Sequence, residues 1–159
     1  LPHDMQRRAS NSALSSVRAA VWYPSPGTPG SRLPLAPATP RKAADRKIDA
    51  VEMYVPFSWF EPMWLENLGF AEPGEGWKMT EDGATALDGD LPVNMSGGVL
   101  SSNPIGASGL IRFAEAAIQV MGKAGDHQVP GARKALGHAY GGGSQYYSMW
   151  VVSSGKPNK

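Results

Sequence analysis

The order of apolar and polar residues predicts a strand followed by a helix near the middle of the chain. Over residues 48–55, polar Asp49 and Glu52 interrupt an apolar run that then becomes continuous, as in a strand that enters a buried sheet. Pro56 ends this run, because proline cannot donate a ladder hydrogen bond. Over residues 59–68 the apolar side chains recur at helical intervals, and a glycine follows at the C-cap position.

The second half of the chain has the most regular helix pattern and two further strands. Over residues 108–123 the apolar side chains recur at three- and four-residue steps, and glycines end the helix. Residues 132–139 and 145–153 are typical of two strands joined by the glycine turn at 141–143. Helices that alternate with strands in this order predict the α/β class.

The first 45 residues differ in composition from the rest and are expected to be disordered. Six prolines fall between residues 22 and 40, which removes backbone donors and leaves little apolar surface to bury. The preceding arginines favour a solvated tail over a nucleic-acid or membrane contact. We therefore expect a Pro/Arg/Ser-rich leader over 1–45, a folded domain over 46–155 and a tail over 156–159. The first residue is Leu1 rather than Met, which leads us to expect a truncated chain.

Size and charge exclude several functional classes. The chain has 159 residues, enough for one domain, of which 42% are hydrophobic and 18% charged. Its net charge is +1, but residues 1–47 hold eight basic and two acidic side chains, a net of +6, so the remaining seven basic and twelve acidic residues give −5. This balance indicates neither a nucleic-acid partner nor a membrane surface. No apolar stretch approaches a membrane span or a signal-peptide core, so a cytoplasmic location is expected.

The sequence contains no cysteine. A disulfide framework and a thiolate metal site are therefore excluded, and no metal site of another kind is predicted. A cysteine nucleophile is also excluded from this chain.

A glycine-rich run leads into the helix that begins at Ser108. Such a run can present backbone N–H groups and the positive end of the helix dipole to an anion, or it can serve only as structural turns. Residues 94–109 read N-M-S-G-G-V-L-S-S-N-P-I-G-A-S-G. This stretch of sequence resembles the thiolase segment N-x-S-G-G-x-L-S-x-G-H-P-x-G-A-[ST]-G.

Other segments resemble thiolases in the same order along the chain. Residues 125–132 are similar to the Q-V-P-G-A loop of lipid-transfer-type thiolases, residues 49–57 fall at their D-V-x-E-x-H-D-C-F strand end, and residues 69–76 resemble their G-[FI]-x-E-P-G-E-G loop. Residues 34–42 resemble the G-P-x-P-A-T-R-K start of the thiolase C-terminal half. The region from residue 48 to residue 153 is thus similar to that half, in particular to its lipid-transfer (sterol-carrier) branch.

The resemblance implies one half of a thiolase fold, an α/β domain with a mixed, mostly parallel sheet and helices on its faces. It also implies a coenzyme A thioester as substrate, either an acyl-CoA or a steroid-CoA, with no bound cofactor. In the family two such halves stack around a pair of buried helices, so an isolated half exposes an apolar face. That face predicts a homodimer or pairing with a thiolase N-terminal half.

The resemblance also implies that most catalytic side chains of the family are replaced. Thiolases use a nucleophilic cysteine, a second cysteine that moves the α-proton, and an oxyanion hole. Tyr54 stands at the position of the His or Asn of the strand end, and Pro56 at that of the following Cys. Asn103 replaces the His of G-H-P, and Ala139 replaces the Cys of C-x-G. The catalytic candidates are Tyr54, Asn103, His138 and Tyr140, and the ligand-binding candidates are Ser96, Gly97, Gly98, Gly106, Gly141 and Gly142.

Each catalytic candidate also has a structural interpretation. Tyr54 can be a half-buried aromatic residue whose hydroxyl finds a partner, and Asn103 a turn residue. His138 can be a structural histidine of a strand, and Tyr140 a packing residue. The functional interpretation of Tyr54 is an acid/base, because members of the branch that cleave steroid side-chain CoA esters by a retro-aldol reaction have a tyrosine there.

Three functions remain open at this point. The chain is the acyl-CoA-binding part of an acyltransferase or carbon–carbon lyase and is inactive alone, or a non-catalytic lipid-transfer module, or a truncated gene product without activity. The absence of cysteine disfavours thiolysis. Tyr54 favours a parent enzyme with aldolase chemistry.

Overall fold

The computed structural model describes residues 18–22, 47–142 and 145–155. The elements of this part are β1 (Arg18–Trp22), β2 (Ala50–Met53), α2 (Phe60–Asn67), α3 (Gly76–Glu81), α4 (Gly98–Ser101), α5 (Ser108–Val120), the 3-10 turn η2 (Gly125–His127), β3 (Lys134–Gly141) and β4 (Tyr146–Ser153). The sequence did not predict α3, α4 and η2, because elements of three to six residues are too short to show a period. No helix in the described part combines the length and the apolar character needed to cross a membrane.

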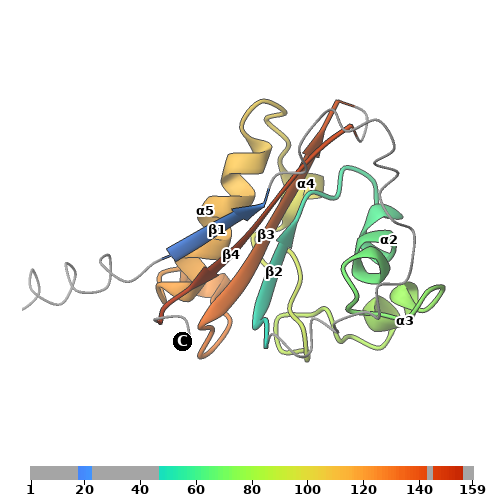
Figure 1. Ribbon diagram of the computed structural model, residues 1–159. Helices are drawn as coiled ribbons and strands as arrows, with labels where there is room; N and C mark the ends of the chain where they lie inside the picture. The colour runs from blue at the N-terminus through green and yellow to red at the C-terminus, as the bar shows by residue number, and fades with distance from the viewer. Residues whose placement is uncertain (1–17, 23–46, 143–144, 156–159) are drawn as a thin grey trace, which may run out of the picture.

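The strands form one mixed sheet in the order β1-β4-β3-β2 (Figure 1). β2 and β3 run parallel, whereas β3 and β4, and β4 and β1, are antiparallel. The prediction of a mixed sheet is confirmed, but "mostly parallel" is wrong for the described strands. The N–H of Gln145 donates to the carbonyl oxygen of Gly141 at 3.1 Å, so the chain has reversed direction between these residues and β4 runs antiparallel to β3. The parallel pair needs a crossover, and α5 lies within the connection between β2 and β3.

β1 corrects the expectation that residues 1–45 are disordered throughout. Its five residues pair with β4, from Arg18 opposite Ser153 to Trp22 opposite Met149. The edge of β4 offers free backbone hydrogen-bonding groups, and the Ala-Ala-Val-Trp run of β1 lacks the prolines that follow it. The rest of the predicted leader, 1–17 and 23–46, and the tail 156–159 lie outside the described residues.

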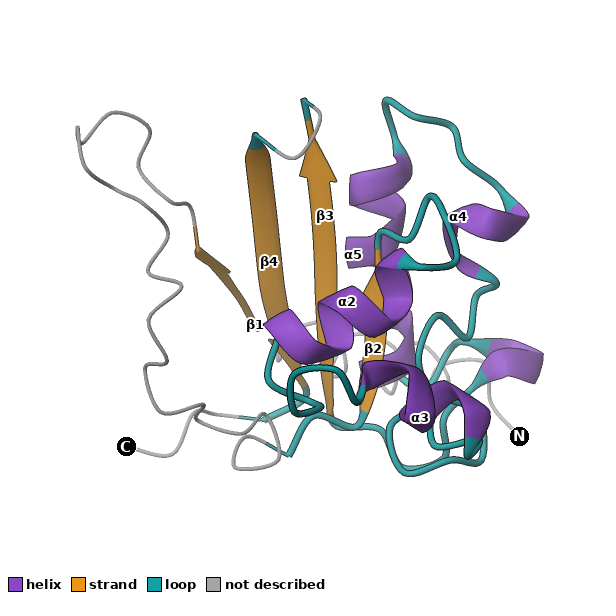
Figure 2. Ribbon diagram, turned by 90° about the vertical axis from the view of Figure 1, so that its right-hand side faces the viewer, coloured by secondary structure: helices purple, strands orange, loops and turns teal. Residues whose placement is uncertain are grey.

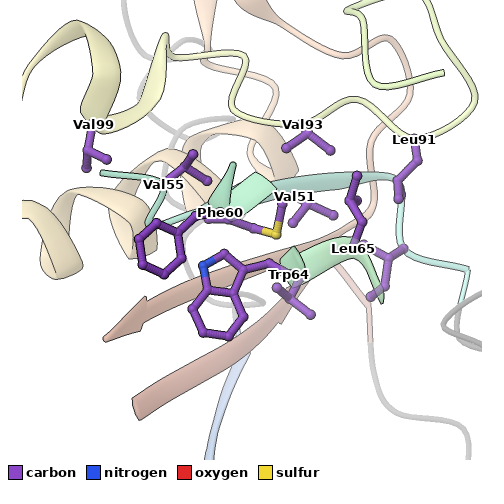
Figure 3. Packing of buried hydrophobic residues seen from close by; sticks show 11 residues of the cluster. Val51, Val55, Phe60, Trp64, Leu65, Leu91, Val93 and Val99 are labelled. Carbon is purple, nitrogen blue, oxygen red and sulfur yellow. The ribbon is translucent and has the colours of Figure 1, made fainter. Parts of the chain in front are cut away.

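The two faces of the sheet pack against different helices. Leu136 of β3 belongs to a buried cluster with residues of α2, whereas its neighbour Ala135 belongs to a second cluster with residues of α5. This alternation follows from the two-residue period of a strand. Figures 1 and 2 show α2 and α5 on opposite faces. On the α2 side, Phe60 and Trp64 direct their rings toward the sheet and form the larger core (Figure 3).

Small residues let α5 approach β3 closely. A Cβ atom on Gly137 would lie 3.2 Å from Cε3 of Trp150 and 3.3 Å from the carbonyl oxygen of Arg112. A Cβ atom on Gly109, in the first turn of α5, would lie 3.1 Å from the Cβ of Ala139. The start of α5 is therefore held beside the end of β3, where several candidate residues lie.

This packing predicts different costs for two glycines of the same strand. Gly137→Val should lower the free energy of unfolding by about 2 kcal/mol or more, because the added atoms collide with α5 and Trp150. Gly141→Val should change it by less than about 0.5 kcal/mol, because no atom of the described residues lies within 4 Å of a Cβ there. Urea unfolding of both variants measures the difference, and equal effects would contradict the close contact.

Candidate functional site

Tyr54 lies at the carboxyl end of β2, where the chain leaves the sheet. Its N–H donates to the carbonyl oxygen of His138 at 3.0 Å, and its own carbonyl accepts from the indole Nε1 of Trp64 at 3.2 Å. These bonds fix its backbone between β3 and α2. The phenol hydroxyl then donates to Oδ1 of Asn103 at 3.3 Å, which joins two residues 49 positions apart.

Asn103 lies in the segment that connects α4 to α5. Its Oδ1 also accepts from the hydroxyl of Ser108, the buried first residue of α5, at 2.7 Å. Two donors on one oxygen hold the amide in one orientation, which leaves the Nδ2 hydrogens for a ligand. Asn103 is itself exposed, so an oxygen atom of a bound molecule can reach this group.

Tyr140 joins the pair from the end of β3. Its ring meets the ring of Tyr54 edge to face, with centroids 5.0 Å apart and an interplanar angle of 84°. Burial raises the pKa of the Tyr140 phenol, and the neighbouring phenols of Tyr54 and Tyr147 raise it further. Tyr140 is therefore a proton-bearing donor at neutral pH. The structure thus brings three of the four catalytic candidates together.

His138 lies deeper, on the face of β3 that packs against α2. Its ring centroid is 4.7 Å from that of Trp64 and 6.5 Å from that of Tyr147, and only 2% of the residue is exposed. Burial lowers its pKa to about 4, and Nδ1 has no hydrogen-bond partner in the described part of the chain. The imidazole is neutral at physiological pH and sits in an aromatic environment rather than in the contact between Tyr54 and Asn103.

A buried ion pair between Glu52 of β2 and Arg112 of α5 holds the glycine-rich loop. Nη1 of Arg112 lies 2.8 Å from Oε2 of Glu52, and both side chains are almost fully buried. The N–H and the hydroxyl of Ser96 donate to the same carboxylate at 3.1 and 2.8 Å. The hydroxyl oxygen of Ser96 accepts from Arg112 at 3.0 Å and from the N–H of Gly98 at 3.2 Å. The polar atoms of Ser96 therefore fix the loop.

The sequence analysis missed the roles of Glu52 and Arg112. Burial raises the pKa of the Glu52 carboxyl above its ordinary value, although the guanidinium of Arg112 and the donors of Ser96 oppose this shift. A charge buried to this extent needs a partner, because an unpaired one is costly. The available signals were an acidic residue inside an apolar strand and an arginine outside the apolar stripe of the 108–123 helix.

The glycine candidates lie in two places. Gly97 and Gly98 have φ angles of +86° and +59°, which only glycine adopts readily, and they turn the loop into α4. Gly106 is exposed in the segment after Asn103, while Gly141 and Gly142 follow Tyr140 at the end of β3. The role of these glycines in ligand binding stays a prediction.

A family model described as thiolase C-terminal domain-like matches residues 38–154, most of the chain. The chain belongs to this thiolase family. The match begins within residues 34–42, whose sequence resembles the start of a thiolase C-terminal half. It includes every residue of the candidate site.

The chain is similar to parts of an acetyltransferase, of sterol carrier proteins and of an aldolase of known structure. An acetyl-CoA acetyltransferase of Methanothermobacter thermautotrophicus is 46% identical over 96 residues, 60% of this chain and 25% of the relative. Human sterol carrier protein 2 is 40% identical over 107 residues, 66% of this chain and 20% of the relative. A solved structure, the Ltp2-ChsH2(DUF35) aldolase, has a TM-score of 0.56 and 28% identity over 67% of this chain and 26% of its own. The chain spans about a quarter or less of each relative.

The buried imidazole predicts a loss of stability in acid. The pKa of His138 falls from 6.5 to about 4 on folding, so between these values the unfolded chain binds more protons than the folded chain. The full stability is present above pH 6.5. As the pH falls toward 4, protonation of this histidine in the unfolded chain lowers the free energy of unfolding by about 3 kcal/mol in total. Urea unfolding across this range should show a shallower pH dependence in His138→Leu than in the unmodified chain. An identical dependence in both proteins would contradict the assignment.

Proposed function

We propose that the chain is the acyl-CoA-binding half of a lipid-metabolising enzyme that cleaves a β-hydroxyacyl-CoA by a retro-aldol reaction. The contact between the Tyr54 hydroxyl and the Asn103 amide carries the proposal, because it joins an acid/base group to an oxyanion-type donor. The solved relative named an aldolase supports this chemistry. Ala139, at the position of the family's C-x-G cysteine, argues against the α-proton transfer that thiolysis needs.

The reaction requires a base for the β-hydroxyl proton and a donor for the developing enolate. In the proposed reaction Tyr54 acts as the base that takes the hydroxyl proton, and the bond between Cα and Cβ breaks. The electron pair moves into the thioester carbonyl to form an enolate, whose oxygen accepts from Nδ2 of Asn103. Tyr54 then returns its proton to Cα. The products are a shortened acyl-CoA and a carbonyl compound.

The proposed enzyme needs a second chain or segment to complete the site. Three large apolar side chains are exposed around α4 and α5, namely Leu100 at 60%, Ile105 at 79% and Leu110 at 71%. Exposed apolar residues next to a candidate site are typical of an interface. We propose that a thiolase N-terminal half or a second copy of the chain covers them. The solved relative carries a second named component, ChsH2(DUF35), which supports a partnered enzyme.

Lipid transfer without catalysis is the second candidate function. Sterol carrier protein 2 relatives from several vertebrates, 35–40% identical, favour it. Pro56 and Ala139, which stand at the cysteine positions of the family, also favour it. In a transfer protein Tyr54 would only donate a hydrogen bond. Its removal would then weaken binding and affect no reaction rate.

Removal of one hydroxyl separates these two functions. In the chain assembled with its partner, Tyr54→Phe should lower the rate of retro-aldol cleavage by about 10²-fold or more, the usual contribution of a general acid/base. The KM should change little, because the ring and its packing remain. Thr80→Val is the matched control, since it also removes one hydroxyl, which donates to Glu61 between α3 and α2 and lies outside the site. An unchanged cleavage rate in Tyr54→Phe would refute the catalytic assignment.

Thiolysis provides an independent check. The purified chain should not cleave a 3-ketoacyl-CoA with free coenzyme A, because it has no thiol to carry the acyl group. The assay follows loss of the ketoacyl-CoA absorbance in the presence of excess coenzyme A. Thiolysis well above the uncatalysed rate would show that the chemistry is assigned wrongly.

A further inference from the structure

A row of aromatic rings in contact leads from the surface to the candidate site. The ring of Trp59 stacks on that of Phe60 with centroids 3.9 Å apart, and the ring of Phe57 stacks on Phe60 at 6.2 Å. Phe60 lies 5.3 Å from Tyr140, which meets Tyr54 at 5.0 Å. We call these five residues the aromatic row. Its inner end is the proposed catalytic phenol.

The outer end of the row is open to solvent. Phe57 is 60% and Trp59 56% exposed, whereas Phe60 is buried at 7%. The core does not account for the two outer rings, because α2 packs on the sheet through Phe60 and Trp64 (Figure 3). Contiguous exposed aromatic side chains beside a site are typical of a binding surface. The two outer rings therefore offer exposed aromatic surface, and the ring contacts through Phe60 place this surface near Tyr54.

The negative charge around the aromatic row determines which part of a CoA thioester can bind beside it. Residues 60–82, which include α2 and α3, contain six acidic residues and one lysine. This charge repels the phosphates of coenzyme A. The acyl group is the uncharged part of the molecule. The charge therefore favours an arrangement in which the acyl group lies on this side and the nucleotide lies elsewhere.

We propose that the aromatic row is an acyl-binding subsite that selects acyl groups with flat aromatic rings over linear alkyl chains. This inference rests on the proposed binding of a CoA thioester. A flat ring can stack in the offset or edge-to-face geometry on the open face of Trp59, and it gains attraction beyond its buried area. A linear chain gains only from burial, and an open row of rings buries it on one side.

The test compares two thioesters whose acyl groups have the same number of carbon atoms, 2-naphthylacetyl-CoA and dodecanoyl-CoA. Calorimetry gives the dissociation constant of each for the chain assembled with its partner and for the same assembly carrying each variant, with free coenzyme A as reference. Trp59→Ala should reduce the ratio of naphthylacetyl to dodecanoyl affinity by about fivefold, the scale of one aromatic contact. Trp59→Phe, which keeps a ring, should retain most of the ratio.

Trp77→Ala is the matched control. Trp77 is 51% exposed on α3, and its Nε1 donates to the carbonyl of Gly74, outside the row. Its removal should leave both affinities unchanged. A ratio of affinities that stays unchanged in Trp59→Ala, whether or not both affinities fall, would overturn the aromatic subsite and leave the proposed function standing. If neither thioester binds more tightly than free coenzyme A to the unmodified chain, the proposed function fails and the subsite fails with it.

Discussion

A buried ion pair connects the three segments that form the candidate site. The carboxylate of Glu52 receives the guanidinium of Arg112 from α5 and the N–H and hydroxyl of Ser96 from the glycine-rich loop. Glu52 lies two positions before Tyr54, and Arg112 lies one helical turn after Ser108, which holds Asn103. The pair thereby sets the separation between the phenol and the amide. A surface salt bridge would not do this, because solvent weakens it and leaves its side chains mobile.

The same constraint explains the orientation of α5. The helix turns polar Ser108, Arg112 and Gln119 toward the sheet and leaves Leu110 71% exposed. Gln119 is satisfied in the interior, since its Oε1 accepts from the N–H of Val129 at 2.8 Å and its Nε2 donates to the carbonyl of His127 at 2.6 Å. A helix that buries polar side chains beside Ala116 and Val120 and leaves Leu110 outside is expected where a second layer covers it. The structure is thus consistent with half of a larger assembly.

The sequence predicts those elements that follow from local periodicity and those residues that match the motifs of the family. The strand at 48–55, the helices at 59–68 and 108–123 and the two C-terminal strands follow from repeated apolar spacing, and the thiolase resemblance pointed to Tyr54 and Asn103. The helical period could not show which face of α5 is inward. It shows that the apolar side chains lie along one side of the helix, but it does not show which surface that side packs against. The Glu52–Arg112 pair depends on residues 60 positions apart that only the folded sheet brings together. β1 was missed because an edge strand is formed by its neighbour more than by its own pattern.

The most direct test of this account is a double-mutant cycle on Glu52→Gln and Arg112→Met, measured by urea unfolding at neutral pH. Either single substitution leaves one buried group without its partner and should cost about 3–5 kcal/mol. The double variant removes both charges, so its cost should fall below the sum of the single costs by at least about 2 kcal/mol. Single costs that add to within about 0.5 kcal/mol would show that the two residues act independently, and that the pair does not hold the site together.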